Sequence, residues 1–344
     1  MKEVSKLSTH LFKNLSFNEW DIILENFETS INYTSWFLNY IEVLNVESRI
    51  QNHTFVIYKN EKPIVIVPLY IENIENTWQI SMGQEPVFAP VFSKNIINTN
   101  HSNLYQYLLK EIDRLAKKSD CKLARFQYSP LLHDKFFKNY YNDFGFIEGI
   151  FYPDWYIFKA KNSFIIDLNK DVDELYRSVR KSNKPHINKT RRETKCYVLD
   201  SSNFDQSLFD SYIALYIEVK GKKRSLLAFS QDEKAIKSGL EVIILCEYNK
   251  HLVGAIALHT FSNKARYNSS IQDSKINRQV YPNHFLLWQS ILYLKEKGFK
   301  KFEVGEQIIY EGVNKITDKE KNLSHFKSGW GGNIVPWVKV EKSY

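Results

Sequence analysis

The sequence predicts an α+β protein of two domains, each with a mixed central sheet flanked by helices. A chain of 344 residues is long for one hydrophobic core and favours two domains. Its hydrophobic fraction of 43%, with only 12 Gly and 9 Pro, is typical of a folded globular protein. One order of elements, namely a hairpin, a third strand, a helix and a strand, is predicted twice, about 185 residues apart. This suggests a duplicated domain, although two unrelated α+β stretches can share such an order.

In the first half, turn residues and apolar spacing define the elements. Leu104, Leu108, Ile112 and Leu115 recur at helical spacing. The segment 84–90 is too rich in proline to be regular. The expected elements are helices at 18–27, 33–44, 102–118 and 131–140, strands at 53–58, 64–71, 78–82 and 123–127, and turns at 59–62 and 143–146.

The second half repeats this order, with strands expected at 164–168, 241–248, 252–260 and 265–269. Pro282 and Asn283 predict the start of an amphipathic helix, with Asn283 as N-cap, and Gly298 predicts its end. Residues 299–304 alternate as a strand, which Gly305 should end. In α/β sheets such a strand end is a usual place for a ligand. The domains would span residues 1–160, the more degenerate copy, and 161–333, followed by a terminal strand at 334–344.

The net charge of +8 predicts attraction to polyanions such as nucleic acid, nucleotides or an anionic membrane face. The longest apolar run, 64–71, contains Pro68 and is far shorter than the about 20 residues of a membrane-spanning helix. Charged residues interrupt the N-terminus before any signal-like run. A soluble, cytoplasmic protein without a transmembrane segment is therefore expected.

The sequence contains no recognisable metal-binding or nucleophile motif. Neither the three cysteines nor four of the histidines have metal-ligand spacing, and no G-x-S-x-G pattern occurs. The residues are Cys121, Cys196, Cys246, His186, His259, His284 and His325. No metal and no tightly bound cofactor are expected, and the scattered cysteines favour a reducing compartment.

The strongest charge run lies between residues 177 and 195, where only Glu193 opposes eight basic side chains. Such a block repels itself unless an anion is present, so it predicts a phosphate or carboxylate site; a solvated helix face is the alternative. Because aromatic residues are scarce in this run, phosphate contact is favoured over base stacking. A second cluster at 220–224 suits either an anion-binding loop or a plain surface loop. The eight residues are Arg177, Arg180, Lys181, Lys184, Lys189, Arg191, Arg192 and Lys195.

Several motifs in the second half, taken in order, resemble those of the Fem family of aminoacyltransferases. They are the basic segment around Lys184–Lys189, Tyr267–Ser270, Tyr281-Pro282-Asn283 before an aromatic helix, Phe302–Gly305 and Phe326–Gly332. The resemblance covers about residues 175–332 and implies two tandem domains of the GNAT acyltransferase type, with the last strand returning to the first domain. It also implies transfer of an amino acid from aminoacyl-tRNA to an amino group of a peptidoglycan or other cell-envelope precursor.

The resemblance suggests roles for individual residues in the attack of an amine on an acyl ester or thioester. By the resemblance, Lys327 would stabilise the oxyanion or contact the donor's terminal phosphate. Glu303 and Glu306 are the acids placed to act as a base; the alternatives are that each is only a salt-bridge partner and that, as the resemblance implies, the substrate itself transfers the proton. The remaining residues are assigned to substrate binding. Phe326 would lie beside Lys327, Tyr267 would contact the acceptor, and Arg180 and Lys184 would bind an anionic group of the acceptor. Asn283 is placed at the helix start. Gly329, together with Gly331 and Gly332, would let the backbone approach the ligand.

Two alternatives stay open at this point. The donor could be an acyl-CoA and the acceptor an amino sugar of a surface polysaccharide, but residues 278–283 lack the glycines that usually cradle the CoA pyrophosphate. The chain could instead be a non-catalytic RNA-binding or adaptor protein that keeps only the basic surface. The expected partners of the leading hypothesis are tRNA and an anionic envelope precursor, with room for peripheral contact with the inner membrane face.

Overall fold

The computed structural model describes residues 7–45, 49–94, 102–132, 156–221, 224–276, 279–308 and 317–344. The chain divides into two compact units, one of residues Met1–Lys161 with Pro336–Tyr344 and the other of residues Asn162–Val335. Both units combine strands and helices around mixed sheets, which confirms the predicted α+β class. Each unit is described separately below.

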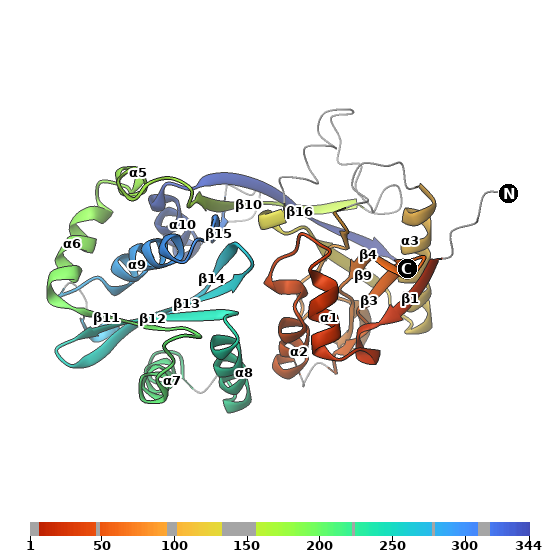
Figure 1. Cartoon of the computed structure of the whole chain (residues 1–344), viewed down its shortest axis with the longest axis horizontal. Helices are drawn as coiled ribbons and strands as arrows, with labels where there is room; N and C mark the ends of the chain where they lie inside the picture. Colours follow the sequence, from red (N-terminus) through yellow and green to blue (C-terminus); the bar gives the residue numbers. More distant parts are fainter. Residues whose placement is uncertain are drawn as a thin grey trace. The chain divides into compact units, whose positions relative to one another are not determined.

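The first unit contains two sheets. One has the strand order β1-β3-β4-β8, and in the other β9 lies between β16 and β6, which is followed by β5 and β2 (Figure 1). The elements are β1 (Leu7–Leu11), α1 (Phe17–Leu24), α2 (Ser35–Leu44), β2 (Gln51–Asn52), β3 (Phe55–Lys59), β4 (Lys62–Val67), β5 (Tyr70–Ile74), β6 (Thr77–Ile80), β7 (Val87–Phe88), β8 (Val91–Phe92), α3 (Ser102–Lys118), β9 (Leu123–Gln127) and the second half of β16 (Asn333–Ser343).

Local sequence accounts well for most of this unit. The helix predicted at 102–118 is α3, and the hairpin turn forms at Asn60 and Glu61, which both have positive φ. The strand predicted at 64–71 is divided into β4 and β5 around Pro68, which has no N–H to donate to a ladder. One short strand, β7, forms in the proline-rich segment expected to be irregular, and β8 follows directly after it. The predicted turn at 143–146, and the predicted helix 131–140 beyond its first two residues, lie outside the described part of the chain.

The second unit is one sheet with helices on both faces. Its strand order is β11-β12-β13-β14-β15-β10, and all neighbours are antiparallel except β14 and β15. The elements are β10 (Tyr156–Asp167), α5 (Val172–Ser178), α6 (Asn183–Glu193), β11 (Lys195–Leu199), α7 (Gln206–Lys220), α8 (Leu226–Lys237), β12 (Glu241–Tyr248), β13 (His251–Phe261), β14 (Lys264–Gln272), α9 (Pro282–Glu296), β15 (Lys301–Gln307) and α10 (Asp318–Lys327).

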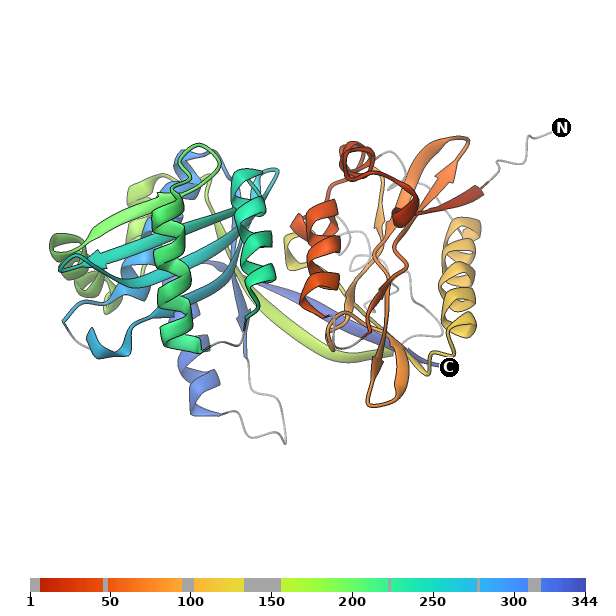
Figure 2. The same cartoon turned by 90° about the horizontal axis from the view of Figure 1, so that it is seen from below.

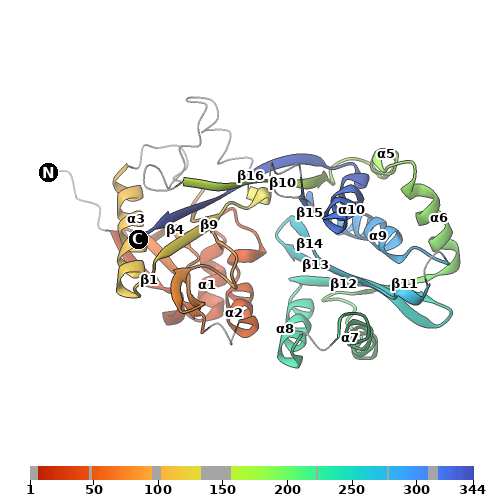
Figure 3. The same ribbon diagram turned by 180° about the vertical axis from the view of Figure 1, so that it is seen from behind.

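The strands of this unit alternate between two hydrophobic cores. In Figures 1 and 3, α9 lies on one face of the sheet and α7 and α8 lie on the other. Ile244, Ile256 and Phe302 point into the α9 core, whereas Ile243 and Ala257 point into the core under α7 and α8. Figure 2 shows α7 and α8 from the side on which they cover the strands. Because both faces are buried, the central strands read as nearly continuous apolar runs.

Three helices of this unit, α7, α8 and α10, were not predicted from the sequence. Each begins at a side-chain cap that the sequence carries: Asp205 for α7, Ser225 for α8 and Thr317 for α10. Thr317 and Glu320 also form a reciprocal capping box. In α10 the apolar residues are too few to show a helical period, whereas Phe209, Tyr212 and Leu215 of α7 do recur at helical spacing, a signal from which this helix could have been predicted.

Two predictions, one about the start of α9 and one about the end of β15, were wrong. The cap position of helix α9 lies two residues earlier than expected, at Tyr281, so Asn283 lies inside the first turn and does not cap the helix. Gly305 does not end β15, which continues to Gln307. Instead, Gly305 adopts φ +114° where the pairing of β15 with β10 shifts by one residue, a bulge that glycine tolerates.

Candidate functional site

Charged side chains gather where β10, β14 and β15 lie next to one another. Arg266 on β14 is the register partner of Glu303 on β15, and its Nε lies 3.7 Å from the Glu303 Oε2. On the other side, the Ser163 hydroxyl of β10 donates a hydrogen bond of 3.1 Å to the Glu303 Oε1. The Glu303 side chain is only 6% exposed and the Arg266 side chain 40%. A buried carboxylate is thus held in place next to an arginine that is open to solvent.

Lys327 joins this group from the last residue of α10. A Cβ atom built on Gly305 would lie 2.8 Å from the Lys327 Nζ, so the lysine side chain occupies the space that a larger residue at position 305 would fill. Burial lowers the pKa of Lys327, the carboxylates of Glu306 and Glu303 oppose this, and Arg266 lowers it further. The amine is therefore partly desolvated and lies near two carboxylates and a second cation.

This arrangement can stabilise negative charge that develops beside it. A partly buried ammonium interacts more strongly with an oxyanion than an exposed one because less water screens the charge. The two carboxylates favour the charged form of the amine, and Arg266 can supply further hydrogen bonds to an anionic group. We call Lys327, Arg266, Glu303, Glu306 and Ser163 the Lys327 cluster.

Arg180 and Gly329, both expected to contact substrate, join α10 to the segment between α5 and α6. The Arg180 guanidinium donates to the His325 carbonyl (2.9 Å) and to the Ser328 hydroxyl (2.7 Å). The Gly329 carbonyl accepts from the Arg180 backbone N–H (2.9 Å) and from the Asn183 amide (3.2 Å). These bonds fix the C-terminal end of α10, the helix that carries Lys327. Arg180 and Gly329 therefore help to hold Lys327 in position.

The glycines of the 329–332 segment were expected to let the backbone approach a ligand, but the space beside them is filled by protein. A Cβ on Gly329 would meet the Asn183 amide, one on Gly331 would meet Ser178, and one on Gly332 would lie 3.0 Å from the Ile165 carbonyl oxygen. The close approach that they permit is therefore to α5, α6 and β10, and contact of these glycines with a ligand stays a prediction.

The other residues expected to bind substrate lie around α6 and α9. Tyr267 is largely buried, its hydroxyl donates to Ser270, and it packs against the α9 core. Lys184 lies 5.0 Å from the ring centroid of Tyr176 and donates to the Arg177 carbonyl. The side-chain oxygen of Asn283 is buried without a hydrogen-bond partner among the described residues.

Phe326 belongs to a chain of aromatic rings that runs from Lys327 toward α6. Its ring centroid lies 5.1 Å from that of His284, which lies 5.0 Å from His186. The rings of His186 and Tyr281 then approach to 3.9 Å. Burial and, to a smaller extent, the nearby His186 together lower the pKa of His284 to about 4. The His284 ring is therefore uncharged at neutral pH. We call these four residues the ring path.

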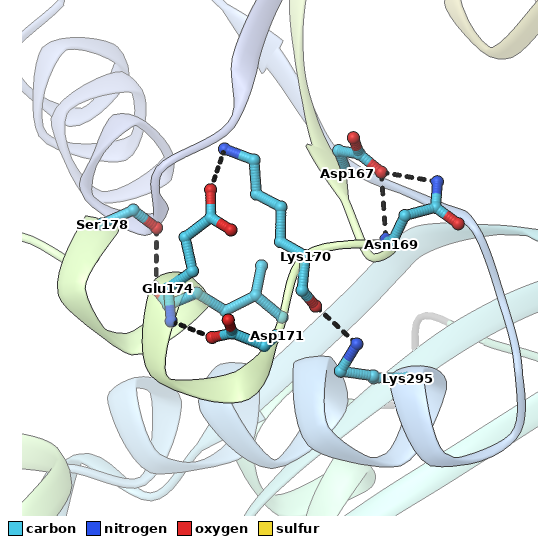
Figure 4. Close-up of polar contacts among 8 residues, drawn as sticks. Asp167, Asn169, Lys170, Asp171, Glu174, Ser178 and Lys295 are labelled. Atoms are coloured by element: carbon cyan, nitrogen blue, oxygen red, sulfur yellow. Dashed lines mark hydrogen bonds and ion pairs between the residues drawn. The ribbon is translucent and has the colours of Figure 1, made fainter.

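The loop before α5 is anchored at both ends, as Figure 4 shows. The Asp171 carboxylate caps α5 by accepting a 2.6 Å hydrogen bond from the Glu174 N–H, and Lys170 pairs with Glu174 at 3.4 Å. Lys295 of α9 donates to the Lys170 carbonyl. Proline often divides a helix, but here α5 and α6 are separated at residues 179–182, and Pro185 lies in the first turn of α6, where proline is tolerated.

A second charged cluster lies under α8, on the face of the sheet away from α9. Arg224 pairs with Asp232 at 2.5 Å, with side-chain exposures of 13% and 1%. Burial raises the pKa of Asp232 to about 6, although Arg224 opposes the shift. Burial, with Asp232 nearby, also raises the pKa of Glu241 well above its usual value. We call Arg224, Asp232 and Glu241 the Arg224 cluster.

Arg266 and Ser163 were not predicted from the sequence as site residues, and the residues of the Arg224 cluster were not predicted to lie together. Arg266 and Ser163 are far from Glu303 in sequence and meet it only through strand register. Arg224 was noticed as part of a basic loop, but nothing local indicates that its partner is Asp232. Among the described residues, no group of His, Cys, Asp and Glu is arranged to hold a metal ion, and no helix is long and apolar enough to cross a membrane.

Comparison with known proteins supports the fold. No protein-family model matches the chain, and no curated protein matches its sequence. The structure resembles that of FemX, with a TM-score of 0.67, 10% identity and 96% of each chain covered. It also resembles the C-terminal domain of a putative lysylphosphatidylglycerol synthetase from Agrobacterium fabrum, with a TM-score of 0.57, 12% identity, and 94% of this chain and 89% of that one covered. A tandem GNAT protein from the clavulanic acid biosynthesis pathway gives a TM-score of 0.50 at 10% identity, with 98% of each chain covered.

These structures define the architectural class of the chain. It has a tandem GNAT fold of the kind found in FemX, which confirms at the level of fold the resemblance drawn from the sequence motifs. Identities of 10 to 12% support the fold alone.

Proposed function

We propose that this chain is an acyltransferase that moves an aminoacyl group from aminoacyl-tRNA to an amino group of a peptidoglycan or other cell-envelope precursor. The observation that carries the proposal is the Lys327 cluster, in which a partly desolvated amine lies beside two carboxylates and an open arginine. The fold shared with FemX and with a putative lysylphosphatidylglycerol synthetase, the second named for joining an amino acid to a phospholipid, favours the same class.

In the proposed reaction, the acceptor amine attacks the ester carbonyl of the aminoacyl group. A C–N bond forms and the C–O bond to the terminal ribose breaks, while the amine proton passes to the leaving hydroxyl. The Lys327 ammonium donates a hydrogen bond to the oxygen that becomes negative in the tetrahedral intermediate. Glu306 and Glu303 keep this ammonium charged against its desolvation, and Arg266 faces an anionic group of either substrate.

A direct transfer assay tests this proposal. Purified protein is mixed with tRNA charged with labelled amino acids and with amine-bearing envelope precursors, and label in the acceptor is measured over time. We expect acceptor-dependent loss of label from tRNA. Equal, slow loss with and without acceptor, matching spontaneous hydrolysis, would contradict aminoacyl transfer.

A second candidate donor is acyl-CoA, because the tandem GNAT protein shares this fold. Thermal unfolding with and without saturating acetyl-CoA separates the two donors. A ligand at about 100 times its dissociation constant adds roughly 2.7 kcal/mol to the folded state, which raises the melting temperature measurably. Our proposal predicts no shift, whereas a clear upward shift would favour a CoA-dependent N-acyltransferase acting on an amino sugar.

A further inference from the structure

The outer face of α6 is the most strongly charged helical surface of the second unit. Asn183, Ile187 and Thr190 bury the inner face of the helix against its neighbours. The exposed face includes Lys189, Arg191 and Arg192, and Glu193 is the one acid within the helix. The exposed cations in and beside α6 are Arg177, Lys181, Lys189, Arg191, Arg192 and Lys195. Cations fixed this close together repel one another, so a polyanion would relieve the repulsion.

The fold places flat aromatic rings next to these cations, although none was visible as part of the basic run. Tyr281 comes from the start of α9 but is tied to α6, since its backbone N–H donates a 2.8 Å hydrogen bond to the Thr190 hydroxyl. Its ring, partly exposed, packs against His186 at a centroid separation of 3.9 Å and an interplanar angle of 37°, and lies 5.9 Å from the Lys189 amine. Aromatic rings thus lie beside the basic residues, although they are scarce within the basic run itself.

The ring path connects this surface to the Lys327 cluster. From the His186 and Tyr281 pair, His284 and Phe326 follow with centroid separations of 5.0 and 5.1 Å, and Phe326 precedes Lys327 in α10. The imidazole of His284 is uncharged, so the path presents ring faces and edges rather than cations. An RNA strand whose bases stack on rings can therefore follow the ring path, with one end of the RNA near the Lys327 amine.

We propose that the outer face of α6 binds RNA, with its arginines and lysines on phosphates and with the Tyr281 and His186 pair stacking an unpaired base near the acyl-bearing end. This inference rests on the proposed function and assigns the donor's RNA to a defined surface. Lysine and arginine side chains neutralise phosphates without reading sequence, and base stacking on aromatic rings is likewise tolerant of sequence.

Binding of uncharged tRNA, measured by fluorescence anisotropy over a series of salt concentrations, tests the surface without requiring catalysis. Reversing two exposed charges, Arg191→Glu with Arg192→Glu, should lower the slope of log affinity against log salt by about 2. The matched control, Lys234→Glu with Lys250→Glu, changes the same number of charges at exposed positions of α8 and of the turn between β12 and β13. It should leave the slope close to that of the parent.

The stacking role has its own variant. Tyr281→Ala should weaken tRNA binding by about 5- to 100-fold with little change in the salt slope, whereas Tyr281→Phe should bind like the parent. Circular dichroism and thermal unfolding confirm that both variants fold. Equal affinity of the alanine variant and the parent would overturn the stacking assignment.

Failure of this inference can be told apart from failure of the proposed function. If tRNA binds through α6 but no aminoacyl transfer occurs, the surface stands and the function falls. If transfer occurs while the α6 variants bind and react like the parent, the surface is wrong and the function stands. Binding of phosphatidylglycerol vesicles through α6 in the absence of tRNA binding would also overturn it, in favour of a membrane-facing surface.

Discussion

The second unit contains two clusters of buried charge that differ in their access to solvent. In the Arg224 cluster, Arg224 and Asp232 are 13% and 1% exposed, and Glu241 is fully buried. In the Lys327 cluster, Glu303 is similarly buried, but its partner Arg266 has a side chain that is 40% exposed. The groups are chemically alike, so exposure and charge balance distinguish the clusters.

This difference separates a structural role from a chemical one. The ion pair of Arg224 and Asp232 (the sealed pair) is too buried to bind a ligand, so it can only stabilise the residues packed around it. Arg224 also lies over the rings of Phe229 and Tyr216, at 5.0 and 5.8 Å from their centroids. An open cluster can exchange its internal ion pairs for contacts with a substrate. We therefore infer that the Arg224 cluster stabilises the fold and that the Lys327 cluster carries the chemistry. The following experiments test this division, in order of decreasing expected effect.

Removing the cation of the sealed pair should produce the largest change. Arg224→Leu leaves Asp232 buried without its countercharge and should lower the free energy of unfolding by about 3–5 kcal/mol. Urea titration at neutral pH measures this. The matched control Arg192→Leu removes an exposed arginine and should change stability by less than about 0.5 kcal/mol. Comparable small effects of both substitutions would show that the sealed pair is not structurally important.

The Asp232 carboxyl should make stability depend on pH. Its pKa is about 6 in the folded chain against 3.8 when unperturbed, so between these values the folded state binds more protons than the unfolded state. The free energy of unfolding should therefore fall as pH rises through this window, by about 3 kcal/mol, and this contribution should be constant above it.

The contribution of Asp232 can be isolated from that of other carboxyls. Unfolding free energies of the parent and of Asp232→Asn are measured between pH 4 and 7, and their difference is plotted. The asparagine variant lacks the titration, so the difference should change with pH only in the window described. A difference that is independent of pH would contradict the raised pKa.

Gly305 offers a test on the open cluster. Gly305→Ala adds a Cβ 2.8 Å from the Lys327 amine at a position with φ +114°, so it should both strain the backbone, by about 1–3 kcal/mol, and displace the amine. Gly298→Ala is the matched control, since Gly298 has φ +80° and nothing within 4 Å of the added atom. Both should lose stability, but only the Gly305 variant should also lose turnover. Equal turnover by the two variants would separate Gly305 from the site.

The smallest effect is expected at Glu241. Burial raises the pKa of this carboxyl and so favours its neutral form, which glutamine resembles in shape; we therefore expect Glu241→Gln to change the free energy of unfolding by less than about 1 kcal/mol at neutral pH. Urea titration again provides the measurement. A loss of several kcal/mol would indicate that Glu241 is ionised in the fold and completes the charge balance of Arg224.

The elements that the sequence predicts best are those whose own residues fix them. Helix α3 has the bounds expected from the spacing of Leu104, Leu108, Ile112 and Leu115, and β12 has the bounds expected from its apolar run. In contrast, α10 is not predicted from the sequence, since Leu323 and Phe326 are its only large apolar residues. Its capping box is a local signal that would have located its start.

The candidate site was less accessible to sequence reasoning for a topological reason. Lys327, Glu303 and Glu306 could be grouped because they lie within one segment with recognisable motifs, and the fold does bring them together. Arg266 and Ser163 reach Glu303 only through pairing with β14 and β10, whose register depends on bulges and tertiary packing. The rings beside α6 were hidden in the same way, since Tyr281 lies about 90 residues from the helix residues that hold it.

The most direct test of the account is single-turnover transfer from labelled aminoacyl-tRNA by three variants at equal concentrations of folded protein. Lys327→Ala should lower the rate by about 100- to 1,000-fold while melting like the parent. Lys321→Ala, which removes an exposed lysine from the same helix, should react normally, and Arg224→Leu should react normally after correction for its unfolded fraction. A Lys327→Ala protein with parental turnover would contradict the assignment of the chemistry to the open cluster.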